Sequence, residues 1–87
     1  MFVIMVYDVG EERLPKILSI GRKYLTWIQN SVFEGEISDA NFIRLKDKLS
    51  KAINREHDAI TFYILRTTAY MKKENLGIIK GESTTII

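Results

Sequence analysis

The sequence predicts a small α+β domain, an α/β sandwich in which helices cover one face of a β-sheet. Segments 2–8 and 59–65 are rich in β-branched and aromatic residues, which is typical of strands. Segments 14–25 and 42–53 have apolar residues at helical spacing. Segment 27–37, between these two helices, is extended in character. Together these observations give the order βαββαβ of a ferredoxin-like fold.

The first strand is expected at residues 2–8, a run that is apolar on both faces and ends at Asp8. Such a run is typical of a central strand that is covered on both sides. The helix after it should begin near Glu12, because Pro15 is tolerated only in a first turn. Gly21 interrupts the apolar face of this helix, so we expect close contact between helix and sheet there. The other residues of that face are Leu14, Ile17, Leu18 and Leu25.

The middle of the chain, residues 27–37, forms either one bent strand or a short hairpin that turns near residues 30–31. The pattern does not distinguish the two. Gly35 within this segment indicates a β-bulge. A second helix follows, with Ser38 or Asp39 as its N-cap. Its buried face consists of Phe42, Leu45, Leu49, Ala52 and Ile53.

The C-terminal part has a strong strand pattern at 59–65 and weaker extended patterns at 69–73 and 78–80. The last residues are again apolar and β-prone. We expect residues 82–87 to form an additional C-terminal strand that pairs with the sheet of a dimer mate, because an uncovered apolar edge is prone to aggregation. The chain, 1–87, is expected to be one domain. The expected dimerisation residues are Thr84, Thr85, Ile86 and Ile87.

The composition excludes several kinds of site. The chain has no cysteine, which rules out disulfides, thiolate metal sites and cysteine nucleophiles and fits a cytoplasmic location. The N-terminal apolar run is too short for a signal peptide or a membrane span, so no membrane role is expected. A net charge of +2 permits nucleic-acid binding without requiring it. Dinucleotide-binding, P-loop, zinc-protease and nucleophile-elbow motifs do not occur.

Asp8 is the first candidate for chemistry, because it ends a buried strand at a point where a side chain reaches solvent. It is either a solvated carboxylate at a strand end or a ligand of Mg²⁺, which usually needs only one or two carboxylates. A two-fold axis that brought two copies of Asp8 together would double the number of ligands.

Basic residues are the second candidate set. Four of them recur at helical spacing away from the apolar face of the second helix, and they form either an ordinary solvated surface or contacts to phosphates. These four are Arg44, Lys48, Lys51 and Arg55. Further positive charge lies near the first helix and after the last strong strand, at Arg13, Lys16, Arg66, Lys72 and Lys73.

His57 and Asp58 precede the last strong strand and should lie at the same end of the sheet as Asp8. His57 is either a general base or an ordinary loop residue. Three aromatic side chains could stack on bases, although aromatic residues in strands more often belong to the core. They are Trp27, Tyr63 and Tyr70.

Three segments are informative in combination: the strand Val3–Asp8, the run Trp27–Gly35 and the charged tail with Leu76 and Gly77. Together they resemble the CRISPR-associated protein two family, the small partners of the CRISPR integrase in spacer acquisition. The order Gln-x-Ser-Val-Phe-Glu-Gly within the second segment is the most specific part. The resemblance covers nearly the whole chain.

The resemblance implies a ferredoxin-like homodimer in which Asp8 and its copy in the dimer mate bind Mg²⁺, or another divalent cation, for phosphodiester cleavage. It places Ser31 and Phe33 beside that site, among the residues expected to bind nucleic acid. Arg13 falls where the family often has basic residues. One departure matters: many members have a basic residue before the Gln of the second motif, and here that position is Trp27 or Ile28.

The resulting hypothesis is a component of the CRISPR adaptation complex, a homodimer that binds duplex DNA and partners the integrase subunits. Magnesium-dependent endonuclease activity toward single-stranded RNA or duplex DNA belongs to the same hypothesis. One alternative is a non-catalytic bridge between integrase subunits, which needs the basic surface but not Asp8. Another is a ferredoxin-like regulatory domain that binds a ligand and has no affinity for nucleic acid.

Overall fold

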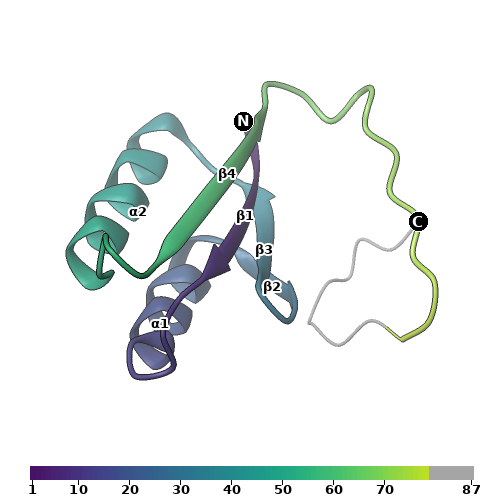
Figure 1. The fold of residues 1–87 in the computed structure, drawn as a ribbon. Coiled ribbons are helices and arrows are strands. Elements are labelled where there is room, and N and C mark those ends of the chain that lie inside the picture. The colour runs from purple at the N-terminus through teal and green to yellow at the C-terminus, as the bar shows by residue number, and fades with distance from the viewer. Residues whose placement is uncertain (79–87) are drawn as a thin grey trace.

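The computed structural model describes residues 1–78 of the chain, which form four strands and two helices (Figure 1). The element order is the one that the sequence predicts. The bounds are β1 Phe2–Asp8, α1 Leu14–Tyr24, β2 Thr26–Gln29, β3 Val32–Glu36, α2 Asp39–Ala52 and β4 Ala59–Leu65.

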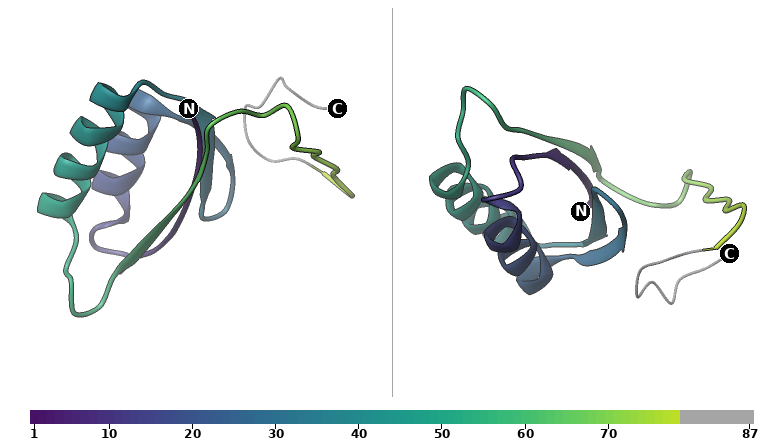
Figure 2. Two further views of the ribbon diagram at one scale, coloured as in Figure 1. Left: turned by 90° about the horizontal axis from the view of Figure 1, so that it is seen from above. Right: turned by 60° about the horizontal axis from the view of Figure 1, so that its bottom comes forward.

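The strands form one antiparallel sheet in the order β2-β3-β1-β4. β1 is central and pairs with β3 on one side and β4 on the other. Both helices lie on the same face of the sheet, as Figures 1 and 2 show. This is the ferredoxin-like sandwich, so the expected fold class is confirmed. Within residues 1–78, no helix has the length and apolar character needed to cross a membrane.

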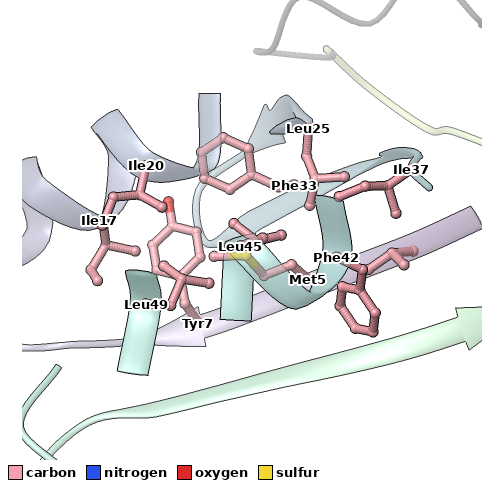
Figure 3. Close-up of a cluster of buried hydrophobic side chains, with 11 residues drawn as sticks. Met5, Tyr7, Ile17, Ile20, Leu25, Phe33, Ile37, Phe42, Leu45 and Leu49 are labelled. Carbon is pink, nitrogen blue, oxygen red and sulfur yellow. The ribbon is translucent and has the colours of Figure 1, made fainter. Parts of the chain in front are cut away.

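The core lies between the sheet and the helices (Figure 3). Met5 of β1 and Phe33 of β3 are fully buried there against Ile17 of α1 and Leu45 of α2. Such tight packing of apolar side chains is the main favourable contribution to folding.

Within one chain only one face of β1 is covered, so the second cover that its apolar run leads us to expect would have to come from another subunit. Val3, Met5 and Tyr7 are buried under the helices, whereas Ile4 is half-buried and Val6 is exposed. Because side chains alternate along a strand, the second set points to the opposite side of the sheet. We call this side, away from the helices, the outer face. On β1 and β4 it comprises Phe2, Ile4, Val6, Asp8, Ala59, Thr61, Tyr63 and Leu65.

Gly21 allows α1 to approach the sheet closely, as the sequence predicts. A Cβ atom at this position would lie 2.7 Å from Cζ of Phe33, closer than van der Waals contact permits. The absence of a side chain at Gly21 therefore makes room for the buried Phe33 ring.

The two helices begin close to where the sequence predicts, except that α1 starts later than expected. α1 begins at Leu14 rather than near Glu12, because a hydrogen-bonded turn occupies residues 11–13. Pro15 lies in the first helical turn, where its missing N–H costs no hydrogen bond. α2 is capped by Ser38, whose Oγ accepts a hydrogen bond from the Asn41 backbone N–H at 3.1 Å.

Residues 27–37 contain a hairpin rather than one bent strand. β2 and β3 pair antiparallel and are joined by a turn at Asn30 and Ser31, and Asn30 has a positive φ of 39°. The irregularity in the pairing lies between Trp27 and Gln29. The bulge expected at Gly35 is therefore wrong, since Gly35 pairs regularly with Val3 of β1.

The segment after β4 contains no strand within residues 66–78, so the extended pattern at 69–73 does not correspond to one. Instead, Lys73 Nζ donates a hydrogen bond to Glu34 Oε2 on the outer face of β3. This ion pair joins the segment to the sheet of the same chain. The pattern at 78–80 lies almost wholly outside the described residues, and the dimerisation strand at 82–87 lies entirely outside them.

Candidate functional site

Asp8 ends β1 as an exposed carboxylate on the outer face of the sheet. It pairs in register with Ala59 at the start of β4. The strand behind it has the exposed Val6 and half-buried Ile4 on the same face. Asp8 is therefore a solvent-accessible charge at the end of an otherwise apolar strip.

The hairpin turn lies at the same end of the sheet as Asp8. The backbone N–H of Tyr7 donates to the carbonyl oxygen of Ser31 at 3.0 Å, which places Ser31 beside the end of β1. Ser31 is half-buried, so part of it is open to solvent. The structure thus brings together Asp8 and Ser31, two of the residues that the sequence proposes for the site.

Phe33 is not available for nucleic acid, contrary to its assignment from the sequence. Its side chain is fully buried and lies 5.8 Å from the Tyr7 ring, between centroids. It also fills the space that Gly21 leaves open. Phe33 therefore supports the strand that leads to the site and does not contact a ligand.

Asp58 is a structural carboxylate just before β4. Its oxygens accept hydrogen bonds from Arg13 Nε at 2.5 Å and Arg13 Nη2 at 2.8 Å. They also accept from the backbone N–H groups of Gly10, at 2.9 Å, and Asn54, at 2.8 Å. The Asp58 side chain has no exposed surface. We call this set the Arg13–Asp58 clamp; it ties the loop after Asp8 to the loop before β4.

The clamp changes the roles of two residues that the sequence singles out. The Arg13 guanidinium and the two backbone donors hold the pKa of Asp58 well below its ordinary value, so Asp58 remains ionised and is no proton donor. The Arg13 guanidinium makes a bidentate contact with this carboxylate, and the Arg13 side chain is 23% exposed. The sequence predicts that Arg13 is free to bind a phosphate. Its pairing with Asp58 does not fit that prediction.

His57 lies at the end of the sheet where the sequence places it, because Ala59 pairs with Asp8. It is exposed in the loop after α2, and its backbone N–H donates to Asn54 O at 3.0 Å. Among the described side-chain hydrogen bonds, none involves the imidazole, so the geometry does not distinguish a general base from an ordinary loop residue.

The remaining basic residues differ in how free their charges are. Lys16 and Arg66 are exposed, and Lys72 is exposed with Glu74 at 3.3 Å. Lys73 is 18% exposed and is paired with Glu34, which argues against the phosphate contact expected for it. Of the four basic residues predicted on one side of the second helix, three lie on α2. The fourth, Arg55, lies in the following loop, because α2 ends at Ala52.

Four lysines from both helices line one groove of about 320 Å³ around Ile20. All four are exposed. Three of them come from two sets that the sequence identified separately, Lys16 from one and Lys48 and Lys51 from the other, and the fold brings them together on the helical layer. We call this the lysine groove; its lysines are Lys16, Lys23, Lys48 and Lys51.

A second groove, of about 400 Å³, lies beside the hairpin turn and was not expected from the sequence. It contains Trp27, which the sequence favours as a core residue but which is only half-buried. The guanidinium of Arg22 lies 5.9 Å from the centre of the Trp27 ring. No sequence pattern joins these two residues, because they meet across the helix–strand junction.

A divalent cation would find only part of a site in one chain. Within residues 1–78 no cluster of three or more His, Asp or Glu side chains is placed to hold a metal. Asp58 is engaged in its clamp, whereas Asp8 is an accessible carboxylate at this end of the sheet. Because Mg²⁺ is often held by one or two carboxylates with water, the Asp8 carboxylate is chemically suited to be one of its ligands.

Comparison with known proteins gives concordant results. The family model described as CRISPR associated protein Cas2 matches residues 1–73. A protein of Dictyoglomus turgidum named CRISPR-associated endoribonuclease Cas2 is 52% identical over 87 residues, covering 100% of both chains. A protein of the same name from Thermotoga maritima is 49% identical over 82 residues, or 94% of each chain.

A solved structure described as a crystal structure of Cas2 superimposes with a TM-score of 0.84. It is 36% identical in sequence, and the match covers 100% of this chain and 98% of that one. The fold, the length and the sequence thus agree over the whole domain. The chain belongs to the CRISPR-associated Cas2 family.

Proposed function

We propose that this chain is a homodimeric, divalent-metal-dependent endoribonuclease in which Asp8 is the catalytic metal ligand. The observation behind the proposal is the position of Asp8, an accessible carboxylate at the end of the outer face. The activity is proposed from the names of the relatives, two of which are about half identical to this chain.

The outer face supports the homodimer. Tyr63 is 58% exposed there, and it pairs with Ile4 in the middle of the β1–β4 ladder. Val6 adds further exposed apolar surface beside it. A second copy packed on this face would remove these side chains from water, and a two-fold axis would place two Asp8 side chains on one shared surface.

In the proposed mechanism, Asp8 and its copy in the dimer mate would hold the cation. The chemistry supplied by bound Mg²⁺ would be stabilisation of the charge that develops on the scissile phosphate. Ser31, which lies beside the end of β1, would donate a hydrogen bond from its hydroxyl to a phosphate oxygen. The Arg13–Asp58 clamp holds the loop that follows Asp8 against the loop before β4, and we expect it to help keep the Asp8 carboxylate in position.

The test is Asp8→Asn, compared with Asp47→Asn. Asp47 is an exposed carboxylate on α2 whose partner is Lys51, so it is a matched control far from the proposed chemistry. Asp8→Asn should lower the RNA cleavage rate by at least about a hundredfold, because a bound metal supplies several kcal/mol of stabilisation. Its unfolding free energy should change by no more than about 0.5 kcal/mol, as is usual at exposed sites.

Cleavage would be measured on purified protein with Mg²⁺ and with a chelator. Asp47→Asn should cleave like the parent in Mg²⁺, and no protein should cleave in chelator. Equal cleavage by the parent and Asp8→Asn would contradict the assignment of Asp8.

A second candidate function is favoured by the lysine groove. Four exposed lysines on the helical layer suit the phosphate backbone of duplex DNA, which an adaptation-complex component that partners the integrase would have to hold. Asp8 does not belong to that surface. If DNA holding is the main role, Asp8→Asn will bind duplex DNA and support spacer integration as well as the parent does.

A further inference from the structure

The groove beside the hairpin turn has a mixed chemical character. Its lining is partly apolar, with Leu14 and Leu18 of α1, and partly polar, with Ser31 and Asn30 of the turn. Its volume of about 400 Å³ lies at the lower end of the range for small-ligand pockets. The remaining lining residues are Tyr7, Arg22 and Trp27. Through Ser31 the groove reaches the edge of the sheet that ends in Asp8.

The Trp27 ring is held in a fixed orientation within this groove. The backbone carbonyl of Asn30 accepts hydrogen bonds from Trp27 Nε1 at 3.1 Å and from the Tyr7 hydroxyl at 2.7 Å. Burial raises the pKa of that hydroxyl, so it stays protonated as a donor. The indole thus has its only polar group satisfied inside the protein, so its ring needs no polar partner from a ligand.

Arg22 supplies a cation beside the Trp27 ring. It lies in the last turn of α1, it is exposed, and its guanidinium is over the Trp27 ring. Within residues 1–78, no carboxylate lies within ion-pair distance of Arg22. A residue from the helix, rather than from the strand, therefore brings positive charge to this edge.

We propose that this groove binds one unpaired nucleotide of a single-stranded RNA, with its base stacked on Trp27 and its phosphate held by Arg22. An aromatic face beside a guanidinium is the combination that single-stranded nucleic acid requires, because stacking accepts any base and the cation pairs with the backbone. A duplex does not fit, since its base faces are covered by neighbouring bases. The inference deepens the proposed function, on which it rests, by naming a substrate contact on the helical side of the sheet, at the same end as Asp8.

The experiment uses Trp27 as its own reporter, because it is the single tryptophan of the chain. Tryptophan emission is followed during titration with an unstructured RNA 12-mer in chelator, so that no metal-dependent cleavage intervenes. The RNA should quench the emission. The matching RNA duplex, and a ribose-phosphate strand without bases, should each need at least tenfold higher concentration for the same quenching.

Variants separate the two contacts, with binding measured by anisotropy of labelled RNA. Trp27→Leu should raise Kd about five- to one-hundredfold, the range for loss of one base–aromatic stack, and Trp27→Phe should keep most of the affinity. Arg22→Gln should lower the salt slope of single-strand binding by about 0.7, the value for one phosphate contact. Lys46→Gln, which removes one exposed positive charge from α2, should leave the quenching by RNA in place.

The inference fails if duplex or base-free strand quenches Trp27 as well as RNA does, or if Trp27→Leu binds RNA like the parent. These results are independent of catalysis. Quenching by RNA in a protein that cleaves nothing would support the groove and contradict the proposed nuclease. Cleavage that survives Trp27→Leu without any change in Kd or rate would support the nuclease and contradict the groove.

Discussion

Two aspartates near the same end of the sheet have opposite roles, and burial decides between them. Asp8 is exposed at the end of β1, whereas Asp58 has no exposed side-chain surface and four hydrogen bonds from Arg13, Gly10 and Asn54. A buried carboxylate is tolerated only when such partners replace water. Asp58 is therefore part of the scaffold, and Asp8 remains available for chemistry.

The Arg13–Asp58 clamp should make the stability of the fold depend on pH, with a loss of stability in acid. Because the folded-state pKa of Asp58 is depressed, its contribution is fully present above the ordinary carboxyl pKa of about 4 and is lost as the pH falls below it. Asp58→Asn should thus have a lower thermal midpoint than the parent at pH 7, with a smaller difference at pH 2–3. Circular dichroism melting at both pH values measures this, and a difference that does not shrink in acid would contradict it.

At the residue scale, the sequence predicts the position of a side chain only where neighbouring residues along the chain determine it. Asp8 follows an unbroken apolar run, so its place at a strand end could be read from the sequence. The burial of Phe33 could not, because it depends on α1 crossing the sheet at Gly21. The meeting of Arg22 with Trp27 likewise depends on tertiary geometry, since one residue belongs to α1 and the other to β2.

At the scale of elements, the contact of α1 with β3 is the tightest constraint. Gly21→Ala should destabilise the protein by about 1–2 kcal/mol, because overpacking costs about 1–3 kcal/mol and alanine returns up to about 1 kcal/mol of helix propensity. The added Cβ would meet the Phe33 ring, which is fully buried and has little room to move. Urea denaturation measures the change.

Ser19→Ala is the matched control for this prediction, since Ser19 is exposed on the same helix. It should be neutral or slightly stabilising. A Gly21→Ala variant as stable as Ser19→Ala would show that the helix can move away from the sheet at little cost.

The elements themselves were predictable where the apolar period is long. Both helices and the two strong strands follow from their patterns, while α1 starts later because a turn precedes it. The sequence did not distinguish a hairpin from a bent strand at 27–37, because its residues suit either a bent strand or a turn. Only the strand pairing in the folded sheet decides between the two. The pattern at 69–73 is β-prone, but a strand also needs a partner edge, and this segment contacts β3 through the Lys73 side chain instead.

At the scale of the whole molecule, the sheet has one covered face and one outer face. Tyr63→Asp should weaken the proposed homodimer by at least tenfold in Kd, because a two-fold axis would bury two new charges in the interface. Tyr63 is more than half exposed in the single chain, so its fold should persist. Sedimentation at micromolar concentration measures the monomer fraction.

Ile43→Asp is the matched control, because Ile43 is 64% exposed on α2, on the helical side of the molecule. It should leave the dimer intact. Dissociation by Ile43→Asp with no effect of Tyr63→Asp would place the interface on the helices and contradict the shared Asp8 site.

The central claim, that one metal site is shared by two Asp8 carboxylates, is tested most directly by mixed dimers. Parent and Asp8→Asn chains with different tags would be refolded together, and dimers with one chain of each kind purified and assayed for RNA cleavage in Mg²⁺. A shared site predicts that these mixed dimers cleave at least about tenfold more slowly than parent dimers, because each would have only half of the carboxylate ligands. Mixed dimers with half the parent rate would show that each chain has its own complete site, and this would contradict the claim.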